Sequence, residues 1–225
     1  MKKQETIQIQ ELDKQEEDGN VKFLVQPIFT PSFILFKKIN LNHLKILNEL
    51  KNLSFNSTNN EDDENNSEIS NSIKVLEEIP EGNEIKKVFK NCFDFGIRSI
   101  WRYNIDHQII NSWATRAFPK TKNEYHNHKN FWLSAVYYPC NERNFKIKFL
   151  SDRQDLGSFQ IPVYDNNIYN GRSWEYTVEQ GDLILFNASL YHKIVKNITP
   201  TVRYSLAMNI LPKGKIGFKD GTLVL

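Results

Sequence analysis

The chain has 225 residues, of which 40% are hydrophobic, 12% aromatic and 25% charged. This is an ordinary globular composition, long enough to bury a hydrophobic core, and no stretch approaches the ~18 apolar residues of a membrane span. The net charge of +2 does not indicate a nucleic-acid or membrane partner.

One acidic segment accounts for most of the charge balance. Residues 54–73 hold five acidic and no basic residues, so the rest of the chain carries 29 basic against 22 acidic residues, a surplus of seven. A surplus of this size is a weak hint of anionic ligands. Cys92 and Cys140 form no spaced motif, which favours buried free thiols in a reducing compartment. No apolar leader follows Met1, so we expect a cytoplasmic protein.

The N-terminal part combines a charged end with two amphipathic helices. Residues 1–20 are polar and predicted to be flexible, and residues 21–38 are predicted to form broken strands around two prolines. Residues 41–53 are predicted to form a helix capped by Asn40, with leucines on one face. Residues 54–73, rich in Asn, Ser and acids, are predicted to be a disordered loop. Residues 83–95 are predicted to form a second helix, and Gly96 is expected to end it.

From residue 97 onward, short runs of β-branched and aromatic residues recur between turn residues. This spacing is typical of an antiparallel sandwich or barrel, and a jelly roll is the natural closed form for about eight strands. We therefore predict a mainly β fold with flanking helices, a double-stranded β-helix (jelly-roll or cupin-like) barrel, in a single domain over 21–225. The expected strands are 97–103, 109–118, 131–139, 145–150, 159–164, 173–178, 181–187, 190–196 and 202–210.

Three histidines form the most informative pattern in the chain. His126 and His128 immediately precede a predicted strand, and His192 lies at the edge of another, 64 residues further on. Residues i and i+2 of a strand point to the same side, so the first pair can face one point and His192 can approach it from a neighbouring strand. Imidazole is a common ligand of iron, zinc and copper. The pattern predicts a metal site, whereas His43 and His107 are expected to be surface and loop residues.

Three segments resemble a family of 2-oxoglutarate/Fe(II) oxygenases that is frequent in bacteriophages and marine bacteria. Residues 124–138 (EYHNHKNFWLSAVYY) resemble its first metal-binding strand. Residues 181–195 (GDLILFNASLYHKIV) resemble the stretch that delivers the distal iron histidine, and residues 203–209 (RYSLAMN) the strand that holds 2-oxoglutarate. The entry at residues 27–31 (PIFTP) is also similar to the family.

The resemblance implies Fe(II) bound by His126, His128 and His192, with 2-oxoglutarate and O₂ as co-substrates. Arg203 and Ser205 are implied to bind the distal carboxylate of 2-oxoglutarate, and both residue types suit that task. Arginine presents a planar, permanently charged fork, and Ser205 shares its strand face and can add a hydrogen bond. The implied reaction couples oxidative decarboxylation of 2-oxoglutarate, to succinate and CO₂, to C–H oxidation of an unknown substrate, usually hydroxylation.

The proximal ligand pair departs from the pattern of the wider superfamily. That superfamily uses His-x-Asp/Glu, whereas His128 occupies the acidic position here and Asn130 follows two residues later. Two interpretations stay open: iron with three histidine ligands, or one of the pair acting outside the coordination sphere while water or a distant carboxylate completes it.

Two other functions compete with the oxygenase. One is a cupin-type metalloenzyme with three histidines that does not use 2-oxoglutarate, which Arg203 with Ser205 argues against. The other is a non-catalytic jelly-roll binding or structural module of a phage. The sequence does not identify the substrate, and exposed strand edges are compatible with a homodimer.

Overall fold

The computed structural model describes residues 33–57, 67–141, 144–150, 171 and 173–225. All described elements fall in one compact unit, Pro31–Leu225. The expectations for residues 1–20 and 21–32, for the middle of the acidic segment and for a strand at 159–164 lie outside the described residues.

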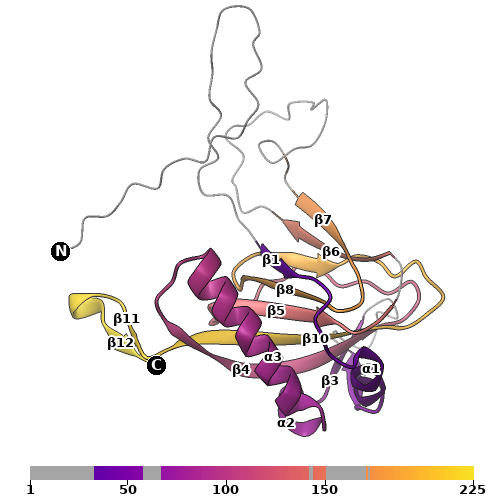
Figure 1. Ribbon diagram of the computed structural model, residues 1–225. Coiled ribbons are helices and arrows are strands. Elements are labelled where there is room, and N and C mark those ends of the chain that lie inside the picture. Colours follow the sequence, from indigo (N-terminus) through magenta and orange to yellow (C-terminus); the bar gives the residue numbers. More distant parts are fainter. Residues whose placement is uncertain (1–32, 58–66, 142–143, 151–170, 172) are drawn as a thin grey trace, which may run out of the picture. The chain divides into compact units, whose positions relative to one another are not determined.

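A seven-stranded antiparallel sheet, the major sheet, forms the centre of the fold (Figure 1). The long strands β10 (Arg203–Lys213) and β4 (Asp106–Ala117) pair over their whole length, with one bulge between Asn209 and Ile210. Bulges are over-represented next to active sites. In spatial order the strands are β1 (Phe33–Phe36), β8 (Asp182–Asn187), β5 (Leu133–Tyr138), β10 (Arg203–Lys213), β4 (Asp106–Ala117), β3 (Glu68–Ser70) and β2 (Phe55–Ser57).

A smaller antiparallel sheet, the minor sheet, packs against one face of the major sheet. It has the order β7 (Ser173–Val178), β6 (Phe145–Leu150) and β9 (His192–Ile194). β6 alternates buried and half-buried residues, with Phe145, Ile147 and Phe149 buried, as expected for a strand with one face in the core. Phe149 stacks on Phe33 of the major sheet with ring centroids 5.1 Å apart, so apolar rings join the two sheets.

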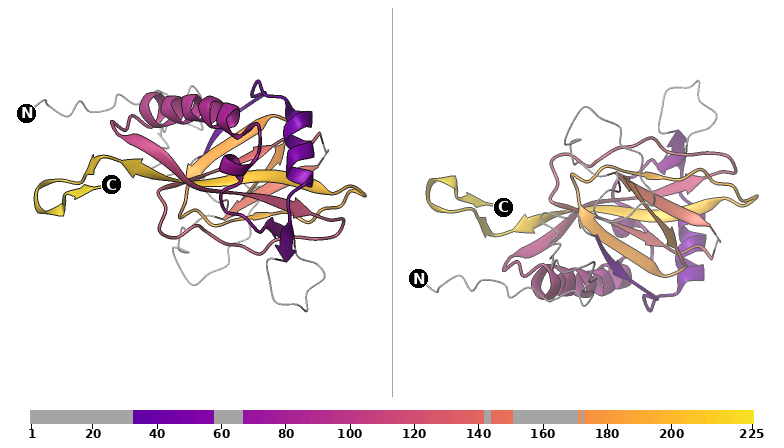
Figure 2. Two further views of the ribbon diagram at one scale, coloured as in Figure 1. Left: turned by 90° about the horizontal axis from the view of Figure 1, so that it is seen from below. Right: turned by 90° about the horizontal axis from the view of Figure 1, so that it is seen from above.

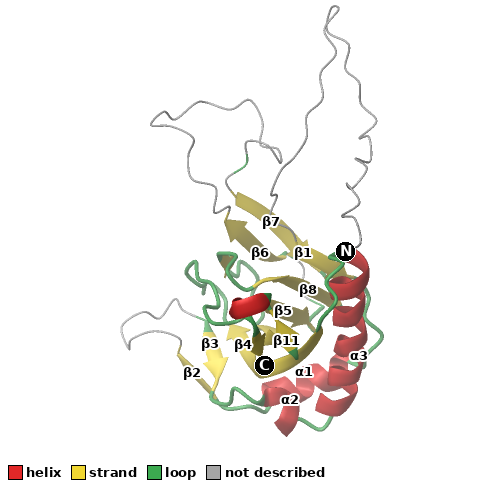
Figure 3. Cartoon of the chain, turned by 90° about the vertical axis from the view of Figure 1, so that its left-hand side faces the viewer, coloured by secondary structure: helices red, strands yellow, loops and turns green. Residues whose placement is uncertain are grey.

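The opposite face of the major sheet is covered by helices, which lie to one side of the strands (Figure 3). Buried residues of α1 and α3, such as Leu50 and Phe89, share a cluster with Leu206 and Met208 of β10. Even-numbered residues of β10 therefore face the helices, and odd-numbered ones face the minor sheet, because side chains alternate along a strand. The helices are α1 (His43–Lys51), α2 (Val75–Glu78), α3 (Gly82–Asp94) and the π-helix η1 (Phe95–Ile100).

A small hairpin ends the chain. Its strands β11 (Lys215–Ile216) and β12 (Leu223–Val224) are joined through the short 3-10 helix η2 (Lys219–Gly221). Figure 2 shows this hairpin extending beyond the end of β10. Within the described part of the chain, no helix is long and apolar enough to cross a membrane.

The two predicted helices are present, with corrected ends. The side chain of Asn42, not Asn40, caps α1 by accepting a hydrogen bond from Lys45 N at 3.0 Å. Gly96 does not end the second helix, and the strand predicted at 97–103 is wrong there. The chain continues as η1, and Gly96 within it packs directly against Ile34 and Leu185, where a side chain would be crowded.

Three further predictions are corrected. His107 is not a loop residue, because it lies on β4 and its ring packs edge-on against Phe93. The acidic segment is not a loop throughout, since β2 and β3 pair with each other and β3 continues the major sheet beside β4. His43 is not a free surface residue, because its Nδ1 is hydrogen-bonded to Tyr137 Oη beneath helix α1. The remaining predicted strands match β4–β10 to within a few residues. Neither Cys92 nor Cys140 forms a disulfide within the described residues; Cys140 is buried and Cys92 half-buried.

Candidate metal and co-substrate site

His126 and His192 are joined directly by their backbones. His126 N donates to His192 O at 3.0 Å and His192 N donates to His126 O at 2.9 Å, so the two residues form an isolated antiparallel bridge. On its other side β9 pairs with β6, which places His192 opposite Phe149. The segment before β5 therefore adds to the edge of the minor sheet, and both imidazoles leave the backbone on the same side.

His128 completes a group of three imidazoles. His128 N donates to Ala188 O at 2.8 Å, which ties the ligand-bearing segment to the turn after β8. The Nε2 atoms of His128 and His192 are 3.3 Å apart, and one ring nitrogen from each of the three histidines lies within 4.8 Å of the others. Within the described residues this group contains no carboxylate. Nitrogen ligands about 2.1 Å from one ion, at right angles, would be about 3 Å apart, which matches the 3.3 Å between His128 Nε2 and His192 Nε2.

Local turns orient two of the rings. His126 Nδ1 lies 3.0 Å from Glu124 O, and His192 Nδ1 lies 2.9 Å from Leu190 O. An Nδ1–H that donates to a carbonyl leaves Nε2 with its lone pair, which is the form in which imidazole binds metals. The turn that leads to His192 is itself fixed, since Ser189 N and Oγ both donate to Asn187 Oδ1.

Burial keeps two of the imidazoles neutral. Burial, with the nearby His126 as a smaller cause, lowers the pKa of His128 to about 4. The same two causes, in the same order, lower the pKa of His192 to about 3. Metal binding requires deprotonated imidazole, so at neutral pH protons do not compete for these two ligand atoms.

Aromatic rings surround the imidazoles on the inner faces of both sheets. His192 packs against Phe186 of β8, with centroids 4.7 Å apart, and against Phe149 of β6. His128 lies against the indole of Trp113 on β4, with centroids 5.3 Å apart. These apolar neighbours exclude water from the side of the site that faces the core.

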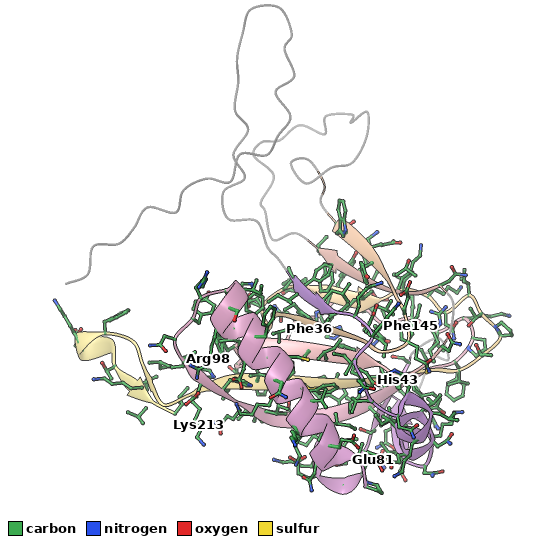
Figure 4. All side chains as sticks on the ribbon, in the orientation of Figure 1. Phe36, His43, Glu81, Arg98, Phe145 and Lys213 are labelled. Carbon is green, nitrogen blue, oxygen red and sulfur yellow. The ribbon has the colours of Figure 1, made fainter. Side chains whose placement is uncertain are left out.

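Arg203 and Ser205 lie on the inner face of β10, as odd-numbered residues, and both are buried. Arg203 Nη2 donates to Asn144 O at 3.0 Å, and its guanidinium lies over the ring of Phe145 at 5.0 Å. Ser205 Oγ is hydrogen-bonded to Thr115 Oγ1 of β4 at 2.6 Å. Figure 4 shows Phe145, which marks this end of β10, far from Lys213 at its other end.

A buried tyrosine lies beside this pair. Tyr138 is fully buried, and its ring packs edge-on against Phe145 at 5.0 Å, the same ring that contacts Arg203. Within the described residues its Oη has no hydrogen-bond partner. Burial raises the pKa of Tyr138, so the hydroxyl stays protonated and can donate. A buried hydroxyl without a partner is costly, and an anion bound beside Arg203 would satisfy it.

Gly181 and Asp182 form the turn that leads into β8, the strand that precedes His192 in the chain. Gly181 has a positive φ of 84°, and a Cβ there would lie 3.0 Å from the His43 ring. The side chain of Asp182 accepts a hydrogen bond from Glu179 N at 3.0 Å, which closes the turn. These contacts fix the start of β8.

Comparison with known proteins identifies the fold and the family. Residues 111–209 match a family model described as "Putative 2OG-Fe(II) oxygenase". This segment belongs to the 2-oxoglutarate/Fe(II) oxygenases. It contains all three histidines together with Arg203 and Ser205, and enzymes of this family use Fe(II), 2-oxoglutarate and O₂. The resemblance drawn from the sequence is therefore confirmed for the core of the oxygenase fold. No curated protein sequence matches the chain.

Solved oxygenase structures share the double-stranded β-helix fold. HygX from Streptomyces hygroscopicus, with nickel and 2-oxoglutarate bound, is 12% identical with a TM-score of 0.54, covering 81% of this chain and 84% of HygX. The carbocyclase SnoK of nogalamycin biosynthesis is 11% identical (TM-score 0.59, 85% of each chain). A prolyl hydroxylase from Trichoplax adhaerens is 10% identical (TM-score 0.52, 80% of this chain and 83% of that one). The predicted jelly-roll class is confirmed.

Sequence reasoning missed three residues that contact the site. An aromatic residue in a strand, such as Trp113 or Tyr138, usually packs in the core, and Thr115 belongs to no recognisable motif. Thr115 pairs with Ser205 across β4 and β10, and Trp113 pairs with Ala207. Their role depends on strand register, which the local sequence does not reveal.

Proposed function

We propose that this oxygenase binds Fe(II) through His126, His128 and His192, and 2-oxoglutarate through Arg203 and Ser205. The observation that carries the proposal is the convergence of three ring nitrogens within 4.8 Å, on a segment that carries the family match. Iron bound there with 2-oxoglutarate and O₂ would supply the oxidation of a substrate C–H bond, with release of succinate and CO₂.

The three-histidine interpretation is favoured over one that places a histidine outside the coordination sphere. His128 Nε2 lies 3.3 Å from His192 Nε2, a separation that suits two ligands of one ion. Within the described residues no Asp or Glu belongs to the group. Three neutral imidazoles leave the full charge of Fe(II) uncompensated, which favours binding of the dianionic co-substrate beside it.

The residues around Arg203 would hold the far carboxylate of 2-oxoglutarate. The guanidinium is oriented by Asn144 O and Phe145, and Ser205 is oriented by Thr115. Tyr138 Oη would donate a further hydrogen bond. Charge-assisted hydrogen bonds of this kind are the strong ones in proteins, and the buried surroundings increase their strength. This arrangement also argues against a three-histidine cupin that does not use 2-oxoglutarate.

Titration of 2-oxoglutarate into the anaerobic Fe(II) protein tests the proposal. We expect a weak visible charge-transfer band with the wild-type protein and slow succinate release once O₂ is admitted. H192A should show neither, whereas R203M should require far more 2-oxoglutarate for the same band. A wild-type protein that binds Fe(II) but gives no band and no succinate would contradict the proposal. The three-histidine cupin and the non-catalytic module would then be the remaining functions.

We propose a small polar molecule as the substrate. HygX, which has the same fold, is also solved with hygromycin B bound. In this protein, polar side chains lie next to Trp113 on the inner face of the major sheet. Asn209 Oδ1 accepts from Ser134 Oγ at 2.7 Å, and Asn111 Oδ1 is buried without a hydrogen-bond partner in the described part of the chain. A panel of polar metabolites should include one that stimulates succinate release in wild type but not in N111L.

Three predictions from the sequence stay predictions. A cytoplasmic location agrees with two free thiols in a chain of this kind. The homodimer and the phage or marine bacterial origin are the other two predictions, and the proposed chemistry of the site depends on neither.

A further inference from the structure

The three histidines are held unequally. His126 and His192 are linked by two backbone hydrogen bonds, and each has its Nδ1 on the carbonyl oxygen two residues earlier. The side chain of His128 has a single hydrogen-bonding contact among the described residues, from its Nε2 to His192 Nε2. That contact lies on the side that would face the metal. Hydrogen bonds of the protein therefore fix the rotation of two rings and leave the third without such a restraint.

The indole of Trp113 is the group that lies against the His128 ring. Their centroids are 5.3 Å apart and the planes are inclined by 35°. Trp113 is only 9% exposed and stands opposite Ala207, whose small side chain leaves room for the indole on the inner face. Its neighbour Ser112 is bonded through N to Ile73 O and through Oγ to Leu76 N, each at 2.9 Å. The indole is thus carried by a rigid part of β4.

We propose that Trp113 is a positioning residue for His128: its indole fixes the imidazole with Nε2 toward the metal. This inference rests on the proposed three-histidine centre. The physical reason lies in the symmetry of the ligand. A carboxylate presents an equivalent oxygen after half a turn, whereas an imidazole turned over directs a C–H or the other nitrogen toward the metal. A histidine at the position that is acidic in the wider superfamily therefore needs a wall that selects one ring orientation, and the Trp113 indole provides it.

Co(II) binding to the purified protein, in place of Fe(II), tests the proposal through affinity. W113L should weaken Co(II) binding about 10-fold, in the range measured for residues that orient metal ligands. W113F, which keeps an aromatic wall, should stay within about 2-fold of wild type. W174L is the matched control, because Trp174 on β7 is 49% exposed and lies outside the site; its affinity should not change.

A double-mutant comparison separates positioning from general loosening of the fold. If Trp113 acts through His128, the W113L change adds nothing in an H128A background. Cu(II) electron paramagnetic resonance gives a second readout that mere destabilisation would not move. The nitrogen hyperfine pattern of wild type should report three imidazoles, and that of W113L should lose one, as in H128A.

The outcomes distinguish this inference from the function on which it rests. Wild type that fails to bind Co(II) would overturn the three-histidine centre and the role of Trp113 together. If wild type binds Co(II), two results would overturn the role of Trp113 alone. Either W113L binds Co(II) as tightly as wild type, or the W113L change lowers the Co(II) affinity by the same factor in the presence and in the absence of His128. If W113L does not fold, W113M replaces it in the affinity and resonance measurements, with the same expected loss of one imidazole.

Discussion

The two halves of the proposed site depend mainly on different sheets. The metal-binding half depends on short elements: β9 has three residues, and His126 joins it through a single bridge. The co-substrate half depends on β4 and β10, which pair over eleven residue pairs and are covered by helices on their far face. Arg203, Ser205 and Thr115 are therefore held by the most extensively paired part of the fold. Metal binding and 2-oxoglutarate binding should consequently be separable by mutation.

Removal of a metal ligand from the minor-sheet half should have the largest effect. In H192A we expect loss of detectable Fe(II) binding and a fall of at least about 10³-fold in succinate release, because the metal supplies the chemistry. Metal titration and succinate assays measure both. K193A is the control, since Lys193 is the next residue on β9 and instead contacts Tyr125 on the outer face. Equal losses in both variants would contradict a specific role for His192.

Removal of the Arg203 guanidinium, in the major-sheet half, should weaken the binding of 2-oxoglutarate and leave Fe(II) binding unchanged. R203M should raise the KM for 2-oxoglutarate by about 100-fold, since it removes charge-assisted hydrogen bonds that together contribute roughly 3 kcal/mol. Fe(II) affinity should not change, and it is measured in the same preparation. Y204F, altered on the helix-facing side of the same strand, should behave as wild type. A parallel loss of Fe(II) binding in R203M would show that the two halves are coupled.

Acid should destabilise the metal-free protein through the metal-binding half. The folded-state pKa values of His128 and His192 are lowered to about 4 and about 3, whereas unfolded histidine titrates near 6.5. Between pH 7 and pH 5 the unfolded chain therefore binds more protons, and the free energy of unfolding falls by on the order of 1–2 kcal/mol per histidine. Urea unfolding in EDTA at both pH values should show a smaller fall in H128Q/H192Q. An unchanged pH dependence in that variant would refute the assignment.

The smallest expected effect concerns the unpartnered hydroxyl of Tyr138. Y138F should raise the KM for 2-oxoglutarate by about 5- to 10-fold, the size of one hydrogen bond. Without ligand, the variant should be as stable as wild type or more so, because it loses a buried hydroxyl that has no partner in the described part of the chain. Thermal unfolding with and without 2-oxoglutarate measures both quantities. Unchanged KM would place the Tyr138 hydroxyl outside the co-substrate site.

Errors in the predicted fold occur where tertiary packing overrides local pattern. The β-branched and aromatic residues after Gly96 are typical of a strand, yet they continue α3 as a π-helix, in which Gly96 packs against Ile34 and Leu185 of the major sheet. The polar segment around Glu68 lacks an apolar strand pattern. It nevertheless forms β3, because it pairs with β4 and the Glu68 carboxylate forms an ion pair with Arg116.

The amino-acid sequence alone determined the β-rich class and most strand positions, and it also led to the five site residues proposed here. Those features depend on short periods: i and i+2 share a strand face, so His-x-His and Arg-x-Ser are recognisable without knowing any partner. Only the tertiary structure decided that Trp113 meets His128 and that Thr115 meets Ser205. It also decided that Tyr138 and Arg203 contact the same Phe145 ring. Those contacts arise from strand register and sheet-on-sheet packing between residues far apart in the chain, and local sequence does not encode them.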